Sequence, residues 1–197
     1  FPENGTNLVS RMEFGADEQI FDDADVVVSG SFFNQRLAAV PLEVNGMVAV
    51  PDPDTGGLTC WCSTQGPFAN RSALSKALGL KKEQVRVIAP AVGGGFGAKM
   101  GAYAEQTVVA ALAHRLGRAV RYMETRSDNL VAMTHGRDQH QEVESGAKRD
   151  GTVTGLKVRV VQNTGAYPGM SVFLPMLTRQ MACGVYRIAK VWFVSEA

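Results

Sequence analysis

A glycine-rich run at residues 93–99 (GGGFGAK) constrains this chain more than any other feature. Residues without a Cβ adopt backbone conformations closed to other residues and let N–H groups approach a ligand closely. The run follows an alternating segment at residues 85–89, which predicts a strand, and precedes an apolar segment at residues 103–116, which predicts a buried helix. A glycine-rich bend in this position is typical of a site for an anionic group.

Two phosphate-binding patterns can be compared with the run. It departs from the phosphate loop of nucleoside triphosphatases, because Ala98 replaces a required glycine and no Ser or Thr follows Lys99. It satisfies the looser dinucleotide fingerprint through Gly93, Gly95 and Ala98. Glu124, at the end of the next predicted strand, stands near the acidic position of that fingerprint. A Rossmann-like dinucleotide-binding module is therefore an alternative hypothesis, although Phe96 places a ring where pyrophosphate needs close backbone approach.

The patterning predicts an α+β fold, with mixed and antiparallel sheets and helices packed on them. A helix is expected to begin at Pro67 and to stop at Gly79. Residues 1–24 hold few apolar side chains and are predicted to be a linker or arm from a preceding domain, with one domain over residues 25–197. The other expected elements are strands at residues 26–33, 37–50, 58–63, 119–123, 141–148, 152–161 and 191–194, a hairpin turn at 150–151, and a short capped helix at 125–133.

Composition argues against two classes of partner. Hydrophobic residues make up 45% of the chain, and 20 basic residues balance 19 acidic ones without a basic block, so nucleic acid is not expected to bind. The apolar stretch at residues 103–116 is too short to span a bilayer.

The N-terminal residues and the cysteines bear on the cellular location. Residues 1–5 lack a signal-peptide pattern and resemble the interior of a longer protein. The three cysteines cannot all pair in disulfides. A cytoplasmic location is therefore expected.

The cysteines and histidines suggest structure more than chemistry. Cys60 and Cys62 point the same way from a predicted strand and are interpreted as buried thiols. His135, Asp138 and His140 are interpreted as polar surface, because a spacing of five places the two histidines on different faces. Three cysteines are also too few for an iron–sulfur cluster, so any cluster must lie on a partner.

Eight short motifs, spread along nearly the whole chain, together resemble those of one protein family. They are residues 41–43 (PLE), 63–65 (STQ), 92–99 (VGGGFGAK), 101–103 (GAY), 124–130 (ETRSDNL), 149–153 (RDGTV), 165–167 (GAY) and 184–186 (GVY). In this order they resemble the molybdenum-binding large subunit of the xanthine dehydrogenase/aldehyde oxidase/carbon monoxide dehydrogenase family. The resemblance is strongest to the carbon monoxide dehydrogenase branch and its bacterial aldehyde-oxidising relatives.

The resemblance implies the first molybdenum-cofactor-binding domain of a larger subunit. That subunit would belong to a molybdenum hydroxylase that oxidises an aldehyde, carbon monoxide or an N-heterocycle with water-derived oxygen. Gln65 corresponds to the glutamine whose amide hydrogen-bonds an oxygen ligand of molybdenum, and with Phe96 it is the catalytic candidate. Gly94, Gly95 and Gly97 join these two as expected contacts of molybdopterin, in its cytosine dinucleotide form. No residue is assigned as a direct metal ligand.

The resemblance also implies partners. They are an iron–sulfur subunit, a subunit carrying FAD, the remainder of the same subunit and a small-molecule substrate. Met100 stands where purine-oxidising members carry a glutamate, which argues against xanthine as substrate. The family's general-base glutamate has no counterpart within residues 1–197, so these residues alone are expected to be inactive and to self-associate through uncovered apolar surface.

Overall fold

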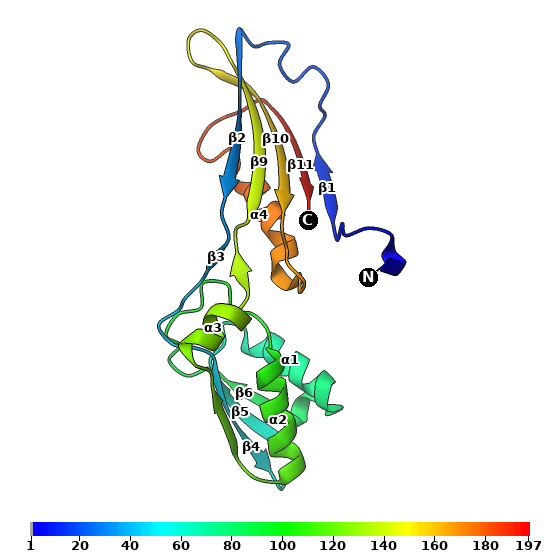
Figure 1. The fold of residues 1–197 in the computed structure, drawn as a ribbon, viewed down its shortest axis with the longest axis vertical. Helices are drawn as coiled ribbons and strands as arrows, with labels where there is room; N and C mark the ends of the chain where they lie inside the picture. The colour runs from blue at the N-terminus through cyan, green and yellow to red at the C-terminus, as the bar shows by residue number, and fades with distance from the viewer. Residues whose placement is uncertain (1) are drawn as a thin grey trace. The chain divides into compact units, whose positions relative to one another are not determined.

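A computed structural model describes residues 2–197 and divides the chain into two compact units (Figure 1). Unit 1 consists of Phe1–Leu37 and Gly136–Ala197, and unit 2 consists of Ala38–His135. Two short strands lie where the chain passes from one unit to the other, β3 (Leu37–Ala38) and β8 (His135–Gly136). Each unit has its own sheet and its own hydrophobic core.

Unit 1 is built on a five-stranded sheet in the order β1-β11-β10-β9-β2 (Figure 1). Strands β10 and β11 pair in parallel, and every other neighbouring pair in this sheet is antiparallel. The predicted hairpin is confirmed: Gly151 adopts a φ of 90° in the turn, and Asp150 accepts a hydrogen bond from the Thr152 N–H. The strands are β1 (Arg11–Phe14), β2 (Val26–Asn34), β9 (Gln139–Ala147), β10 (Val153–Gln162) and β11 (Lys190–Glu196).

The core of unit 1 lies on one side of the central strands. Helix α4 (Leu174–Met181) packs against β10 and β11 there, although the sequence pattern predicted no helix in this segment. Residues 1–24, expected to be a linker or arm, contribute strand β1 to the sheet. The buried apolar side chains of this core are Leu156, Val158, Val160 and Phe193. Two short 3₁₀ helices, η1 (Pro2–Asn4) and η3 (Gly169–Phe173), complete the unit.

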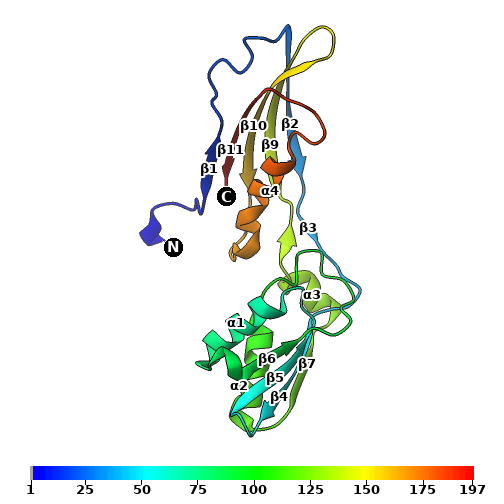
Figure 2. The ribbon, with the colours of Figure 1, turned by 180° about the vertical axis from the view of Figure 1, so that it is seen from behind.

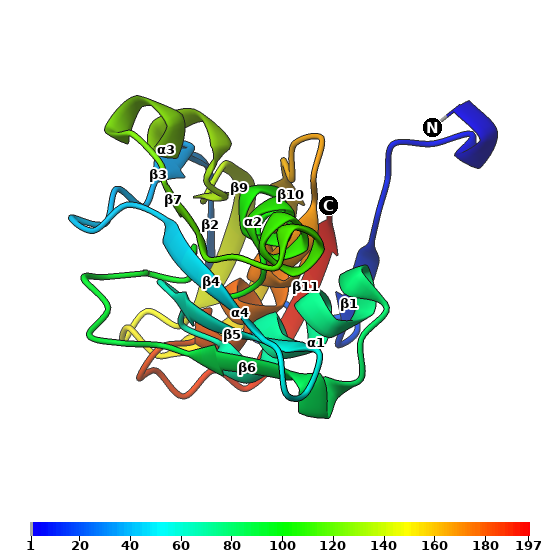
Figure 3. The ribbon, with the colours of Figure 1, turned by 90° about the horizontal axis from the view of Figure 1, so that it is seen from below.

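Unit 2 is built on a four-stranded sheet in the order β6-β5-β4-β7. Strands β5 and β6 are parallel neighbours joined by helix α1, whereas β4 is antiparallel to both β5 and β7. Helices α1 and α2 cover one face of this sheet (Figures 2 and 3). The elements are β4 (Gly46–Asp52), β5 (Gly57–Cys62), α1 (Pro67–Leu78), η2 (Lys82–Gln84), β6 (Val85–Ile88), α2 (Ala104–Leu116), β7 (Val120–Met123) and α3 (Arg126–Ala132).

Local sequence signals explain the ends of the helices in unit 2. Pro67 occupies the first turn of α1, and Gly79 ends it with a left-handed φ of 67°, as predicted. Thr125 caps α3 by accepting a hydrogen bond from the Asp128 N–H, and the Asp128 carboxylate accepts one from the Thr125 N–H. Gly117 ends α2 in the left-handed conformation. The chain therefore encodes these boundaries locally.

Two expectations about unit 2 are wrong in detail. The strand expected over residues 37–50 is two strands, β3 and β4, separated by an irregular segment that contains Pro41. Helix α2 is not buried all round, because Val108 and Leu112 lie on an exposed face. The α+β class with mixed and antiparallel sheets and helices packed on them is confirmed. Across residues 2–197, no helix is long and apolar enough to cross a membrane.

Candidate functional site

The sheet of unit 2 brings two distant segments of the chain to one edge. Strands β5 and β6 run in parallel, with Trp61 opposite Ile88 near their carboxyl ends. The carboxyl ends of neighbouring parallel strands meet at the same edge of a sheet, where binding sites of α/β proteins form. Gln65 follows β5, and the glycine loop, residues 93–99, follows β6. The two motifs therefore meet although helix α1 separates them in the sequence.

Gln65 is fixed by the glycine loop through its side chain and its backbone. Its carboxamide oxygen Oε1 accepts hydrogen bonds from the N–H groups of Gly97 and Lys99, each at 3.0 Å. Its own N–H donates to the Lys99 carbonyl at 2.8 Å. Because Oε1 faces two donors, the orientation of the amide is set and its Nε2 is left as a donor directed away from them. The fold therefore brings Gln65 into direct contact with the glycine run.

The backbone of the glycine loop turns through left-handed conformations. Gly94 has a φ of 98° and Gly97 a φ of 85°, and Phe96 between them has a φ of 52° with its side chain 75% exposed. A left-handed conformation at a non-glycine residue costs on the order of 1–3 kcal/mol and is concentrated at functional sites. In the described residues, the N–H groups of Gly94, Gly95 and Phe96 have no protein acceptor. These groups remain available to an anionic ligand.

Gly95 is required by the approach of Gln65. A Cβ built on Gly95 would overlap the Cδ and Oε1 atoms of Gln65. A Cβ on Gly93 would lie 2.6 Å from the Cβ of Glu43, which is also closer than real side chains approach. The glycines of the loop therefore serve close packing as well as backbone freedom.

Lys99 ends the loop and is fully buried. Its Nζ donates to the Glu43 carbonyl at 2.8 Å, to Glu43 Oε2 at 3.0 Å and to Ser63 Oγ at 2.7 Å, so all three donors are used. Glu43 Oε2 also accepts from Ser63 Oγ at 2.6 Å and from the Gly93 N–H at 2.9 Å. Partial burial acts to raise the pKa of Glu43, but the hydrogen bonds from Ser63, Lys99 and Gly93 and the charge of Lys99 outweigh it and lower the pKa. We call Lys99, Glu43 and Ser63 the Lys99 cluster.

Helix α3 holds the same segment from a second direction. Arg126 Nη2 donates to the carbonyls of Pro41 and Leu42, at 2.5 and 3.0 Å, immediately before Glu43. Arg126 Nη1 donates to Asn129 Oδ1 at 2.7 Å. The backbone around Glu43 is therefore tied to α3 as well as to the glycine loop.

The dinucleotide alternative has no support in this geometry. Glu124 is 7% exposed, and its Oε1 accepts hydrogen bonds from the Asn45 N–H and from Asn129 Nδ2. It is thus engaged within the unit and not free for a ribose. The sheet is also mixed, whereas a Rossmann sheet is mostly parallel, and α2 begins only at Ala104, well after the loop.

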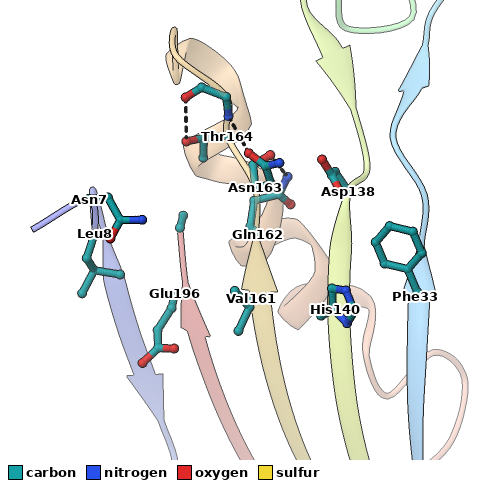
Figure 4. A pocket seen from close by; sticks show the side chains of 12 residues that line it. Asn7, Leu8, Phe33, Asp138, His140, Val161, Gln162, Asn163, Thr164 and Glu196 are labelled. Atoms are coloured by element: carbon teal, nitrogen blue, oxygen red, sulfur yellow. Dashed lines mark hydrogen bonds between the residues drawn. The ribbon is translucent and has the colours of Figure 1, made fainter.

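The other candidate residues lie elsewhere in the fold. Cys60 and Cys62 are buried in the core of unit 2, and burial raises their pKa values to about 11 and about 12. Asp138 and His140 line a hollow of about 660 Å³ in unit 1 (Figure 4), and Asp138 pairs with Arg36 at 2.9 Å. Within residues 2–197, no three His, Cys, Asp or Glu side chains gather closely enough to hold a metal ion.

Comparison with known proteins decides the family. Residues 1–197 match the molybdopterin cofactor-binding domain over their full length. The chain belongs to this family. It is 36% identical over 152 residues to the carbon monoxide dehydrogenase large chain of Hydrogenophaga pseudoflava, covering 77% of this chain and 19% of that one. It is 30% identical over 204 residues to the nicotine 6-hydroxylase large subunit of Paenarthrobacter nicotinovorans, covering 99% and 24%.

A solved structure agrees with this assignment. Quinoline 2-oxidoreductase from Pseudomonas putida 86 superposes with a TM-score of 0.87 and 31% identity, covering 97% of this chain and 25% of that one. The chain thus spans about a quarter or less of the length of these relatives. The recognition of this family from the motifs is confirmed.

The described geometry fits a molybdopterin group at the glycine loop. Three N–H groups of the loop lack a protein acceptor, and Gln65 presents a free amide donor beside them. At Gly95 the Gln65 carboxamide occupies the space that a side chain would need.

The sequence analysis did not predict the Lys99 cluster as a functional feature, although Glu43, Ser63 and Lys99 each lie within one of the motifs. No spacing rule relates Glu43 to Lys99, because the two meet only through the tertiary fold.

Proposed function

We propose that this chain holds the molybdenum–molybdopterin group of a molybdenum hydroxylase and presents it to a small substrate through the edge of unit 2 formed by Gln65 and the glycine loop. The observation that carries the proposal is the fixed orientation of Gln65, whose Oε1 is held by Gly97 and Lys99 so that Nε2 remains a donor. Membership of the molybdopterin cofactor-binding domain family supports the nature of the ligand.

The proposed contacts divide between backbone and side chain. The N–H groups of Gly94, Gly95 and Phe96 would stabilise negative charge on the group, and Gln65 Nε2 would donate to one of its oxygen acceptors. Gly97 serves by holding Gln65. When bound, the molybdenum–pterin group supplies the two-electron oxidation of the substrate, with water as the source of oxygen. The chain's own contribution is to orient the group with donors arranged before it binds.

The finer points of the proposal follow the relatives. We propose an aldehyde, carbon monoxide or an N-heterocycle as substrate. The relatives include a carbon monoxide dehydrogenase, a nicotine 6-hydroxylase and a quinoline 2-oxidoreductase, and the aldehyde follows from the resemblance of the motifs to aldehyde-oxidising members of the family. We also propose the cytosine dinucleotide form of the cofactor, iron–sulfur and FAD-bearing partner subunits and a cytoplasmic location. Residues 1–197 alone are proposed to lack turnover, since the relatives' chains extend far beyond the matched segment.

The test is cofactor analysis of the protein at its natural length, co-purified with any partner subunits. We expect near-stoichiometric molybdenum by mass spectrometry and a pterin released by acid oxidation. Carbon monoxide, aldehydes and N-heterocycles are then assayed with an artificial electron acceptor, and oxygen from labelled water is expected in the product. A preparation with neither molybdenum nor pterin, made in cells that supply both, contradicts the proposal.

A further inference from the structure

The Lys99 cluster contacts the glycine loop at both ends, but its lysine has no donor left for a ligand. All three donors of Lys99 Nζ are used within the cluster, and its side chain is fully buried. A lysine at the end of a glycine-rich loop would ordinarily be assigned to an anionic ligand. Here Lys99 is buried and its ammonium group is fully bonded to Glu43 and Ser63, so its charge stabilises the Glu43 carboxylate instead of a ligand.

The cluster ties three separate segments together. Glu43 Oε2 accepts from the Gly93 N–H at the start of the loop and from Lys99 Nζ at its end. Ser63 donates to the same oxygen from the segment that leads to Gln65. The Glu43 N–H donates to the Gly93 carbonyl at 3.1 Å. One carboxylate oxygen thus fixes both ends of the loop and the approach of Gln65.

We propose that Glu43 is a positioning residue, which with Lys99 and Ser63 sets the separation between Gln65 and the free N–H groups of the glycine loop. Removing its charge leaves the ammonium of Lys99 buried without a carboxylate, and a buried unpaired charge is strongly unfavourable. The loop is the element that can yield, because Gly93, Gly94 and Gly97 restrict its backbone least. The expected consequence is a mobile loop in an otherwise intact unit 2. Only the consequence for cofactor binding rests on the proposed function.

The experiment is hydrogen exchange with mass spectrometry on the natural-length protein and its Glu43→Gln variant. We expect the exchange of a peptide covering residues 93–100 to rise about tenfold or more, and that of residues 104–116 in α2 to change less than about twofold. Asp52→Asn is the matched control, since Asp52, the last residue of β4, also accepts hydrogen bonds from a hydroxyl, Thr55 Oγ1, and from backbone N–H groups. It is expected to leave the exchange of the loop peptide unchanged.

Two further variants keep the test decisive. If Glu43→Gln does not fold, Ser63→Ala, which removes one hydroxyl of the cluster, is expected to raise the exchange of the same peptide alone. In the double variant Glu43→Gln/Lys99→Met, neither charge remains, so stability should recover while the exchange of the loop peptide stays high. Unchanged loop exchange in the variants, or an equal rise in every peptide of unit 2, overturns the inference.

Molybdenum content is measured on the same preparations. Loss of molybdenum in Glu43→Gln, with wild-type content retained in Asp52→Asn, is expected. A wild-type protein without molybdenum would contradict the proposed function, but the exchange results would still decide whether Glu43 positions the loop.

Discussion

Gln65 and Lys99 hold each other through hydrogen bonds in both directions. The Gln65 N–H donates to the Lys99 carbonyl at 2.8 Å, and the Lys99 N–H donates to Gln65 Oε1 at 3.0 Å. The pair joins the end of one parallel strand to the loop that follows its neighbour. This reciprocal contact fixes which atom of the Gln65 amide faces outward, and the proposed function depends on that atom.

Gln65→Glu distinguishes the acceptor role of the Gln65 amide from its donor role. A carboxylate oxygen can still accept from Gly97 and Lys99, but the variant has no donor in place of Nε2 and adds a negative charge. We expect an intact fold and a fall in turnover of about 100-fold, as for loss of an oriented donor at an active site. Steady-state kinetics per bound molybdenum provides the measurement.

Gln84→Glu is the control for that variant. Gln84 Oε1 likewise accepts a hydrogen bond from the Lys81 N–H, and Gln84 Nε2 donates to the Thr55 carbonyl, but Gln84 lies in η2. Its replacement should leave turnover unchanged. Equal losses in the two variants would mean that a general structural effect is being measured.

Gly95→Ala should disturb the site by steric overlap. The added methyl group meets the carboxamide of Gln65, so either the side chain or the loop must shift. We expect the free energy of unfolding to fall by about 1–3 kcal/mol, as for overpacking, with a matching loss of molybdenum. Gly101→Ala is the control, because a Cβ there meets nothing within 4 Å, and it should change stability by less than about 0.5 kcal/mol. Denaturant unfolding measures both.

Acid should loosen the glycine loop through Glu43. The pKa of Glu43 is lowered below its ordinary value of 4.5, so its stabilising contribution is fully present above pH 4.5 and is lost as the pH falls through the lower, folded-state value. Other carboxylates titrate in the same range, so the measured quantity is the difference in unfolding free energy between wild type and Glu43→Gln. That difference should shrink as the pH is lowered below 4.5; a constant difference would show that the charge of Glu43 is not involved.

The sequence predicts the elements of unit 2 well because their signals are local. Pro67 and Gly79 bound α1, and Thr125 with Asp128 caps α3, all within a few residues of the boundary that they define. Helix α4 in unit 1 carries only one such signal, Pro175 in its first turn: Phe173 precedes it without a side-chain cap, and Ala182 follows it in a right-handed conformation instead of a glycine stop. It packs on β10 and β11, strands that lie in a different part of the sequence.

The site divides in the same way. Gln65 and the glycine run are recognisable because residue type and local order carry the signal. The pairing of Lys99 with Glu43 is not, since 56 residues separate them and the contact exists only after β4, β5 and the loop have assembled. The parallel pairing of β5 and β6, which brings Gln65 to the loop, is likewise a property of the folded sheet.

The buried thiols of unit 2 should be inert in the native protein. Burial raises the pKa of Cys60 to about 11 and that of Cys62 to about 12, so the thiolate is scarce at neutral pH. Cys183, which is partly exposed, should react with iodoacetamide first. Peptide mapping after alkylation at pH 7.5 measures the order. Labelling of Cys60 or Cys62 as fast as Cys183 would show that the core of unit 2 opens readily.

A crystal structure of the natural-length protein with its molybdenum–pterin group bound tests the central claim most directly. The account predicts Gln65 Nε2 within about 3 Å of an oxygen acceptor on that group, with Oε1 still bound by Gly97 and Lys99 and the group seated against the N–H groups of residues 94–96. A pterin group bound elsewhere, or one at this edge with the Gln65 amide turned away from it, would contradict the account.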